Sequence, residues 1–380
     1  MNFKSLLKKK IHRNLSYFRD RFYESMDRRT DRKILVIESD DWGSIRVPSI
    51  EAKCYLLRKG YDMDSRPFER CDSLESDNDL DALYNVLLRY KDTKGNPPIF
   101  TLNTLMANPD FSKIKESGFS QYFYEDATLT YLRYSNSSRV PALMQWGEEK
   151  GLVYMQSHGR EHVNYSQWLD LLRKGNTDQM TAFELGMCGI FPKNSPESGN
   201  KLMRALSYSD NLENNAVLGS VCEGLQLFEK RFGRKSISFV APCSIWSNEI
   251  EQKIANAGVQ MIQTARVQNQ HDISNQRKVY HYMGEKNRYG QLYSVRNCIF
   301  EPAINRDGLE AERCFCQVSK AFASGKIAVI SSHRINYTSR IIPDNGKMTL
   351  KQLDNLLGRI VRTFGDVEFM TSPMLLGSVL

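Results

Sequence analysis

The feature that most constrains the fold of this chain is an alternation of short apolar runs with longer segments of helical periodicity. Short apolar runs bounded by turn or polar residues are typical of buried parallel strands. Strands are predicted at Lys33–Glu38, Ile99–Leu102, Leu152–Gln156, Ser236–Val240, Val259–Gln263, Tyr293–Phe300, Lys326–Ile330 and Val367–Met370. Helices are predicted at Leu80–Tyr90, Tyr165–Leu172, Ala216–Phe232, Asn248–Ala257, Ala311–Ala323 and Thr349–Phe364. Seven or eight strands with intervening helices indicate an α/β protein, built on a parallel sheet or a closed β/α barrel.

The length and composition of the chain fit one large domain. The chain has 380 residues, of which 41% are hydrophobic and 25% are charged, as in ordinary globular proteins. Barrels of alternating strands and helices often reach this size as a single domain. Residues 104–150 and 265–292 lack a clear periodicity and are expected to be loops and insertions over the open face. We therefore predict one catalytic barrel over residues 33–380, preceded by an N-terminal extension over residues 1–32.

The N-terminal extension is basic and has helical periodicity. Residues 1–33 hold eleven Lys and Arg against four Asp and Glu, and the whole chain has a net charge of +8. Apolar residues recur every three or four positions, at Phe3, Leu7, Ile11, Leu15, Phe18 and Phe22. This spacing predicts an amphipathic helix. The helix can contact an anionic membrane surface through residues 1–29, or it can pack on the barrel with its basic face in solvent. Nucleic-acid binding is not expected, because no recognised motif accompanies the charge.

Signals for export and membrane insertion are missing from this sequence. No apolar run approaches the roughly 20 residues that cross a bilayer. The N-terminus has no apolar core followed by a small-residue cleavage site. The eight cysteines lack the spacing of a metal-binding motif and are expected to be reduced, mostly buried thiols. The expected location is the cytoplasm, with any peripheral membrane contact at the inner face.

Two adjacent aspartates follow the first predicted strand. Asp40 and Asp41 lie at the position along a strand where α/β proteins collect catalytic groups. Adjacent carboxylates repel each other unless a cation offsets their charge. One of them can therefore bind a metal while its neighbour acts as a general base. The structural alternative is a turn or a helix N-terminus, where Asp is common.

Two histidines follow the third predicted strand. His158 and His162 are four residues apart, a spacing that places them on one face of a helical turn, and neutral imidazoles are good metal ligands. Turn or core histidines are the structural alternative. The segment also matches the HxxEH pattern of a metallopeptidase family, with Glu161 as the catalytic residue. Gly159 within the motif and the strand directly before it favour a strand-end loop over that peptidase helix.

A third cluster follows the predicted strand Lys326–Ile330. His333 lies there and can protonate a leaving group, provided that it faces the metal. Strand ends are where catalytic groups gather in α/β folds. The three clusters together therefore predict one metal-dependent hydrolytic site, assembled from distant stretches of chain.

The pattern resembles the polysaccharide deacetylases, the NodB-like carbohydrate esterase family 4. That family carries an Asp-Asp motif, a His-x-x-x-His motif, a Pro-containing motif and a late His motif in this order, and the similarity would cover most of residues 30–375. The resemblance implies a distorted (β/α) barrel of seven to eight mostly parallel strands. It also implies hydrolysis of an acetyl group, most often an N-acetyl group, on a sugar.

The resemblance assigns a role to each motif residue. Asp40 is implied as the general base and His333 as the general acid. The implied ligands of one divalent metal ion are Asp41, His158 and His162. A His, His and Asp set accepts Zn, Co, Ni, Mn or Fe, and zinc is the first expectation.

Several positions depart from the family pattern. Trp42 stands where the family usually has Gly after the Asp pair, and the third motif, Val240–Cys243, lacks its arginine. We expect Arg296 or Arg334, each near a predicted strand end, to substitute for that arginine. The Asp and Trp of the family's fourth motif find no match.

Two further kinds of residue are expected to meet the substrate. The resemblance implies the backbone N–H of Cys243 as an oxyanion donor. Trp42 and Trp246 can stack on a sugar or belong to the core.

The predicted reaction is the removal of an acetyl group from a sugar of a surface polysaccharide or its precursor. The missing arginine makes an inactive carbohydrate-binding protein on the same fold the main alternative. A glycoside hydrolase is disfavoured, because adjacent carboxylates cannot flank a glycosidic bond and the histidine pair would have no role.

Overall fold

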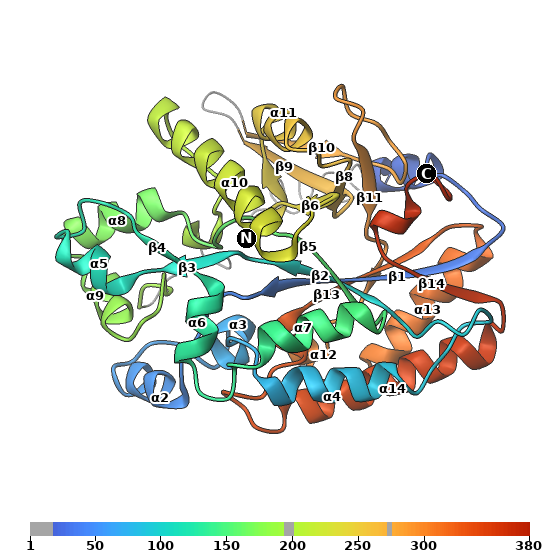
Figure 1. Ribbon diagram of the computed structural model, residues 1–380, viewed down its shortest axis with the longest axis horizontal. Helices are drawn as coiled ribbons and strands as arrows, with labels where there is room; N and C mark the ends of the chain where they lie inside the picture. The colour runs from blue at the N-terminus through green and yellow to red at the C-terminus, as the bar shows by residue number, and fades with distance from the viewer. Residues whose placement is uncertain (1–17, 194–200, 272–275) are drawn as a thin grey trace, which may run out of the picture.

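The computed structural model describes residues 18–193, 201–271 and 276–380 (Figure 1). Its main sheet contains β1 (Lys33–Trp42), β2 (Phe100–Thr104), β5 (Val153–Ser157), β6 (Ser238–Val240), β8 (Met261–Thr264), β11 (Leu292–Val295), β12 (Cys298–Ile299), β13 (Ala328–His333) and β14 (Val367–Met370). The strand order is β11-β8-β6-β5-β2-β1-β13-β12, and β14 also pairs with β1. Every pairing in this sheet is parallel. The predicted α/β class is confirmed, with nine strands where seven or eight were expected.

The sheet closes on itself at two residues. β11 and β12 are the two ends of the strand order, yet only Arg296 and Asn297 separate them in the chain. The Arg296 N–H donates to Thr264 of β8 at 2.9 Å, and the Asn297 N–H donates to Val329 of β13 at 3.1 Å. The predicted single strand Tyr293–Phe300 is therefore wrong. It is two strands on opposite edges, and the link between them joins the edges into a distorted barrel.

Alternation along β1 separates the outer core from the barrel interior. Leu35 and Ile37 belong to the hydrophobic cluster beneath the outer helices, whereas Ile34 and Val36 belong to a second cluster with Val329 and Met370. Successive side chains of a strand point to opposite faces. Continuing the second face along the strand places Glu38 and then Asp40 in the interior. The barrel interior is therefore apolar at one end and charged at the other.

Helices cover the sheet on both sides. They are α2 (Ile50–Arg58), α3 (Pro67–Cys71), α4 (Asp77–Leu87), α5 (Phe111–Glu116), α6 (Ala127–Arg133), α7 (Val140–Glu149), α8 (Tyr165–Arg173), α9 (Thr177–Glu184), α10 (Asn211–Phe232), α11 (Asn248–Asn256), α12 (Pro302–Asn305), α13 (Glu310–Ala323) and α14 (Asn345–Thr363). Figure 1 shows α4, α7, α13 and α14 along one side, with α10 and α11 on the other. None of the helices in the described ranges combines the length and apolar composition that a bilayer-spanning helix needs.

The two regions predicted to be insertions are more ordered than expected. Residues 104–150 contain a short two-stranded sheet, β3 (Ala107–Pro109) with β4 (Tyr124–Asp126), and three helices. Residues 265–292 contain the hairpin of β9 (Val267–His271) and β10 (Gln276–Tyr280), which joins β7 (Ile245–Trp246) in a three-stranded sheet. The expectation of unstructured loops is wrong, because these strands are too short to give a periodic signal in the sequence.

Only the end of the N-terminal extension lies within the described residues. Residues 18–25 are helical, and the proposed membrane contact of residues 1–29 falls mostly on residues 1–17, outside the described part. Asp27 fixes this end to the barrel. Its carboxylate accepts hydrogen bonds from Arg266 at 3.0 and 2.8 Å and from Lys326 at 3.1 Å. Phe18 and Phe22 of the predicted apolar stripe are exposed, so this portion is fixed to the barrel through Asp27 and not through that stripe.

Candidate active site

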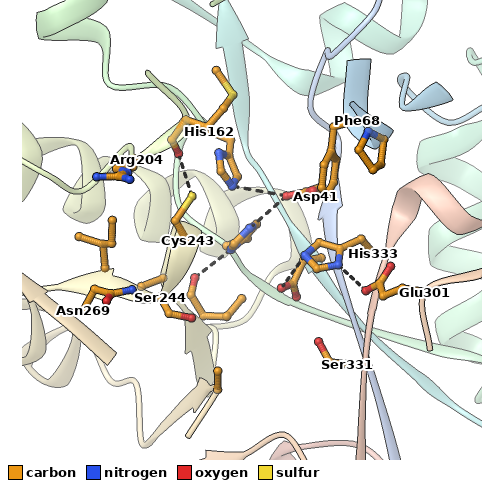
Figure 2. Close-up of a pocket in the computed structure, with 18 of the residues that line it drawn as sticks. Asp41, Phe68, His162, Arg204, Cys243, Ser244, Asn269, Glu301, Ser331 and His333 are labelled. Carbon is orange, nitrogen blue, oxygen red and sulfur yellow. Dashed lines mark hydrogen bonds and ion pairs between the residues drawn. The ribbon is translucent and has the colours of Figure 1, made fainter. Parts of the chain in front are cut away.

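A cavity of about 1250 Å³ opens at the carboxyl ends of the barrel strands (Figure 2). Its lining includes Asp40, Asp41, His158, His162, Cys243, Arg296 and His333, but not Trp42, Trp246 or Arg334. These lining residues come from β1, from the loops after β5 and β6, from the barrel-closing link and from β13. Parallel pairing thus brings distant parts of the chain to one edge, as in other α/β proteins.

One carboxylate and two imidazoles converge at the floor of this cavity. Asp41 Oδ1 lies 3.3 Å from His158 Nε2 and 3.6 Å from His162 Nε2. One ligand atom from each of the three residues lies within 4.8 Å of the others. Three protein ligands of this kind, with further positions left open, are the usual donor set of a catalytic metal site. The three residues predicted as ligands are therefore brought together.

Hydrogen bonding and burial prepare both imidazoles to act as ligands. His158 Nδ1 lies 2.9 Å from the Val240 carbonyl, which can only accept, so Nδ1 carries a hydrogen and Nε2 is the nitrogen that faces Asp41. Such a partner on the remote nitrogen is the usual support of a metal-binding histidine. Burial lowers the pKa of His162 to about 4, so its ring is neutral at physiological pH. Burial raises the pKa of Asp41, but the two histidines outweigh it and hold that pKa well below its ordinary value.

A tight turn at the end of β1 presents Asp41. Asp41 has φ 75° and Gly43 has φ 88°, both in the left-handed region. Glu75 accepts the Gly43 N–H at 3.0 Å, and Arg334 Nη1 donates to Glu75 at 3.1 Å and to the Ser44 carbonyl at 2.5 Å. A strained non-glycine residue persists only where its surroundings fix it, and such residues cluster at functional sites. Arg334 therefore supports this turn and does not reach Asp40.

Asp40 lies beside the metal-type cluster and is held by an arginine. Arg296 makes two hydrogen bonds of 2.7 Å to the carboxylate, and Asn103 of β2 donates a third at 2.7 Å. Burial alone would raise the pKa of Asp40, but the Arg296 guanidinium lowers it well below its usual range. Glu38 accepts from Arg296 Nε at 2.6 Å and fixes the guanidinium in turn. Of the two arginines expected to replace the missing one, Arg296 makes this contact.

His333 lies across the cavity from the histidine pair. Its Nδ1 is 2.6 Å from Glu301 Oε1, and its Nε2 is 3.9 Å from Asp40 Oδ2 (Figure 2). Burial lowers the pKa of His333, whereas the negative charge and hydrogen bond of Glu301 raise it to a net value of about 10. The imidazole is therefore protonated at neutral pH, with Nε2 facing the reacting region.

The Pro-containing motif forms the opposite wall. Cys243 and Ser244 have φ 57° and 54°, so the backbone turns sharply just after Pro242. Cys243 is exposed at this wall, and its Sγ donates to the Met203 carbonyl at 3.5 Å. A thiol that donates is protonated, so it is not a nucleophile in this arrangement. The backbone of Cys243, rather than its side chain, remains the group of chemical interest.

Of the two alternatives for Trp42 and Trp246, stacking on a sugar and packing in the core, the structure shows the core for both. Trp42 is fully buried, its Nε1 donates to Ser39 at 2.9 Å, and its ring stacks on Tyr337. Trp246 is also buried and donates to Glu251 at 2.9 Å. Neither lines the cavity. The apolar core takes both rings because each indole N–H finds an internal acceptor.

The peptidase pattern in this segment has no structural counterpart. The segment from His158 to Asn164 is a loop between β5 and α8, not a helix. Glu161 is buried and accepts from Arg160 at 2.5 and 2.9 Å, so its carboxylate is committed to an ion pair. The two histidines converge from a loop. The helical turn that was expected to bring them together is not formed.

Two residues of the site were missed from the sequence. Glu301 directly follows the predicted strand Tyr293–Phe300, so a carboxylate at a strand end was its only signal. Asn103 follows the predicted strand Ile99–Leu102 in the same way. A single polar residue after a strand is too common to be singled out without its partners, and those partners are remote in sequence.

Comparisons with known proteins give distant structural similarities. Neither a protein-family model nor a curated protein matches the chain. A family 4 carbohydrate esterase from Streptomyces lividans in complex with acetate is similar in structure, with 10% identity, TM-score 0.38, and coverage of 90% of this chain and 94% of that one. A peptidoglycan deacetylase from Bacillus subtilis has 9% identity, TM-score 0.39, and covers 90% of each chain. A pseudoenzyme of the same esterase family from Bacillus anthracis has 10% identity and TM-score 0.36, with coverage of 91% and 66%. The first and third of these structures are from the family 4 carbohydrate esterases, which the motifs resemble, and the third is a pseudoenzyme.

Proposed function

We propose that this protein is a metal-dependent hydrolase that removes an acetyl group from a sugar. One observation carries the proposal: a ligand set of Asp41, His158 and His162 lies next to a fixed carboxylate, Asp40, and a protonated imidazole, His333, whose Nε2 is 3.9 Å from Asp40 Oδ2. Hydrolysis of an amide needs a proton acceptor for water and a proton donor for the leaving nitrogen. The cavity offers both, beside one candidate metal position.

The donor set fits a divalent cation. The two Nε2 atoms and Asp41 Oδ1 face one another, and His158 Nδ1 is engaged with a carbonyl. A cation held there would polarise the acetyl carbonyl and lower the pKa of a bound water. Zinc suits this set, and Co, Ni, Mn or Fe would also bind.

The chain's own residues would then handle the protons and the charge. Asp40 is ionised and oriented by Arg296 and Asn103, so one of its oxygens can accept a proton from attacking water. The Cys243 backbone N–H would donate to the oxyanion, a contribution of about 3 kcal/mol when such a donor is well placed. His333 would donate its Nε2 proton to the departing amine while Glu301 holds Nδ1.

The inactive carbohydrate-binding alternative loses its main support. It was favoured by the arginine missing from the third motif, and Arg296 now makes the bidentate contact with Asp40. The substrate we propose is an N-acetyl sugar of a surface polysaccharide or its precursor.

The first test is the metal content of the purified protein, measured by elemental analysis beside His158→Ala. We expect close to one equivalent in the wild type and a loss of at least about tenfold in occupancy in the variant, because a ligand is removed. Acetate release from acetylated oligosaccharides should fall with it. His271→Ala is a matched control, since His271 lines the cavity away from the ligand set. A wild type that binds no metal after reconstitution, or a metal-free variant with unchanged acetate release, would rule out this mechanism.

A further inference from the structure

The cavity holds more positive than negative side chains. Among the described residues that line it there are six Arg and Lys and four Asp and Glu: Arg46, Arg66, Arg204, Arg277, Lys278 and Arg296 against Asp40, Asp41, Glu69 and Glu301. A cleft lined by one sign of charge concentrates ligands of the opposite sign. The excess matters only if the carboxylates are already engaged elsewhere.

Each lining carboxylate has a cationic or imidazole partner of its own. Asp40 pairs with Arg296 at 2.7 Å, and Glu301 pairs with His333 at 2.6 Å. Asp41 faces the histidine pair. Glu69 lies 3.6 Å from Arg46. None of these four carboxylates is left to neutralise the remaining cations of the lining.

Three of those cations lie on the wall opposite His333. Arg204 follows the short helix η1 (Lys201–Met203), and Arg277 and Lys278 belong to β10. Across the described ranges, the side chains of Arg204 and Lys278 have no hydrogen-bond or ion-pair partner, while Arg277 Nε donates to Gln270 at 2.7 Å. All three side chains are exposed. Figure 2 shows Arg204 and Asn269 on the far side of Cys243 from His333.

The three-stranded sheet fixes the position of Lys278 relative to the reacting region. Lys278 is opposite Asn269 of β9, and Asn269 is opposite Ile245 of β7; all three line the cavity. Ile245 follows Cys243 by two residues. Since neighbouring strands are about 4.8 Å apart, the Lys278 backbone lies roughly 10 Å from β7. A group attached beside the acetylated sugar, not the acetyl group itself, would meet this cation.

We propose that the substrate is an acidic glycan, with a carboxylate or phosphate bound by Arg204 and Lys278 while the acetyl group faces Asp41. This inference rests on the proposed function, because it names the substrate class of the same site. Guanidinium groups bind both anions through paired N–H donors, so the two sources share one chemistry.

Binding measured by calorimetry tests the inference without requiring turnover. Three probes are compared: a neutral N-acetylglucosamine oligomer, an oligomer that alternates N-acetylglucosamine with glucuronic acid, and uridine diphosphate N-acetylglucosamine. We expect an anionic probe to bind wild type at least about tenfold more tightly than the neutral one, and more weakly in high salt. The anionic probe that binds more tightly shows whether the bound group of the substrate is a carboxylate or a phosphate.

The variant Arg204→Gln/Lys278→Gln should lose the anion preference. Each charge is expected to contribute about fivefold, and affinity for the neutral probe should stay unchanged. Lys91→Gln/Lys150→Gln is the control, since it removes two exposed lysines outside the cavity. Equal or absent binding of neutral and anionic probes, or a double variant that binds the anionic probe like wild type, would overturn the inference. Acetate release is measured separately. If neutral probes are hydrolysed and anionic probes are not preferred, only this inference is overturned. If anionic probes bind selectively but neither hydrolysis nor bound metal is found, only the proposed reaction is overturned.

Discussion

At the scale of single residues, the proton donor of the proposed reaction depends on Glu301. Burial lowers the pKa of His333, and the Glu301 carboxylate 2.6 Å from Nδ1 raises it to about 10. Glu301→Gln removes that charge, so we expect the pKa to fall toward the ordinary value of about 6.5. Activity that needs the protonated ring is lost as pH rises through its pKa. The alkaline limb of kcat/KM should therefore move to lower pH by about one unit or more.

The pH profile of acetate release measures this shift directly. Glu312→Gln serves as the control, because Glu312 is an exposed carboxylate paired with Arg359 outside the cavity. Its profile should match that of the wild type. An alkaline limb that stays in place in Glu301→Gln would show that His333 does not supply the proton.

At the scale of elements, the end of β1 is expected to tolerate no side chain at Gly43. Gly43 has φ 88°, and an added Cβ would lie 2.6 Å from the Leu105 backbone oxygen. Gly95 has φ 83° with no heavy atom within 4 Å of an added Cβ, so Gly95→Ala is a matched control for backbone strain alone. We expect Gly95→Ala to cost about 1 kcal/mol of unfolding free energy and Gly43→Ala about 2–4 kcal/mol, with loss of metal. Urea unfolding measures the two losses of unfolding free energy, and elemental analysis measures the bound metal. Equal losses of unfolding free energy in the two variants would contradict the steric argument.

Most elements could be predicted from the sequence because they have local signals. Helix α10 is an example: it ends at Phe232, as predicted, and Gly233 follows it in the left-handed conformation. It begins at Asn211 and not at Ala216, because Asp210 caps the helix by accepting the Glu213 N–H. The break at Arg296–Asn297 could not be predicted, since apolar residues resume directly after these two polar ones and only the pairing at the far edges of the barrel reveals it. The candidate ligand set could be predicted because each motif places several ionisable side chains within a few residues of sequence. Glu301 and Asn103 could not be predicted as site residues, because their roles depend on contacts with residues that are remote in sequence.

At the scale of the whole molecule, the two ends of the barrel differ: one end holds the candidate active site, and the other holds ion pairs that are expected to serve stability. Arg32, just before β1, donates to Glu368 of β14 at 2.7 and 2.8 Å, and Lys94, in the segment before β2, donates at 2.6 Å. These residues lie at the amino ends of the strands, opposite the cavity, and none lines it. Barrel enzymes place catalysis at the carboxyl ends of strands, and residues that serve stability at the other end. The Arg32 and Lys94 contacts lower the pKa of Glu368 to about 2.

Glu368→Gln should therefore reduce stability and leave the site unchanged. The lowered pKa means that the contribution is complete above the ordinary Glu pKa and is lost as pH falls through about 2. Because Arg32 and Lys94 are partly exposed, we expect a loss of only about 1 kcal/mol at pH 7. Urea unfolding from neutral pH downward should show the gap to wild type narrowing below about pH 4.5, with kcat and metal content unaltered throughout. Glu116→Gln, at an exposed carboxylate without an ion pair in the described ranges, should show no gap at any pH. A difference in unfolding free energy that is independent of pH would mean that the Glu368→Gln substitution disturbs packing and not the ion pair. A fall in kcat would show that the two ends of the barrel are coupled.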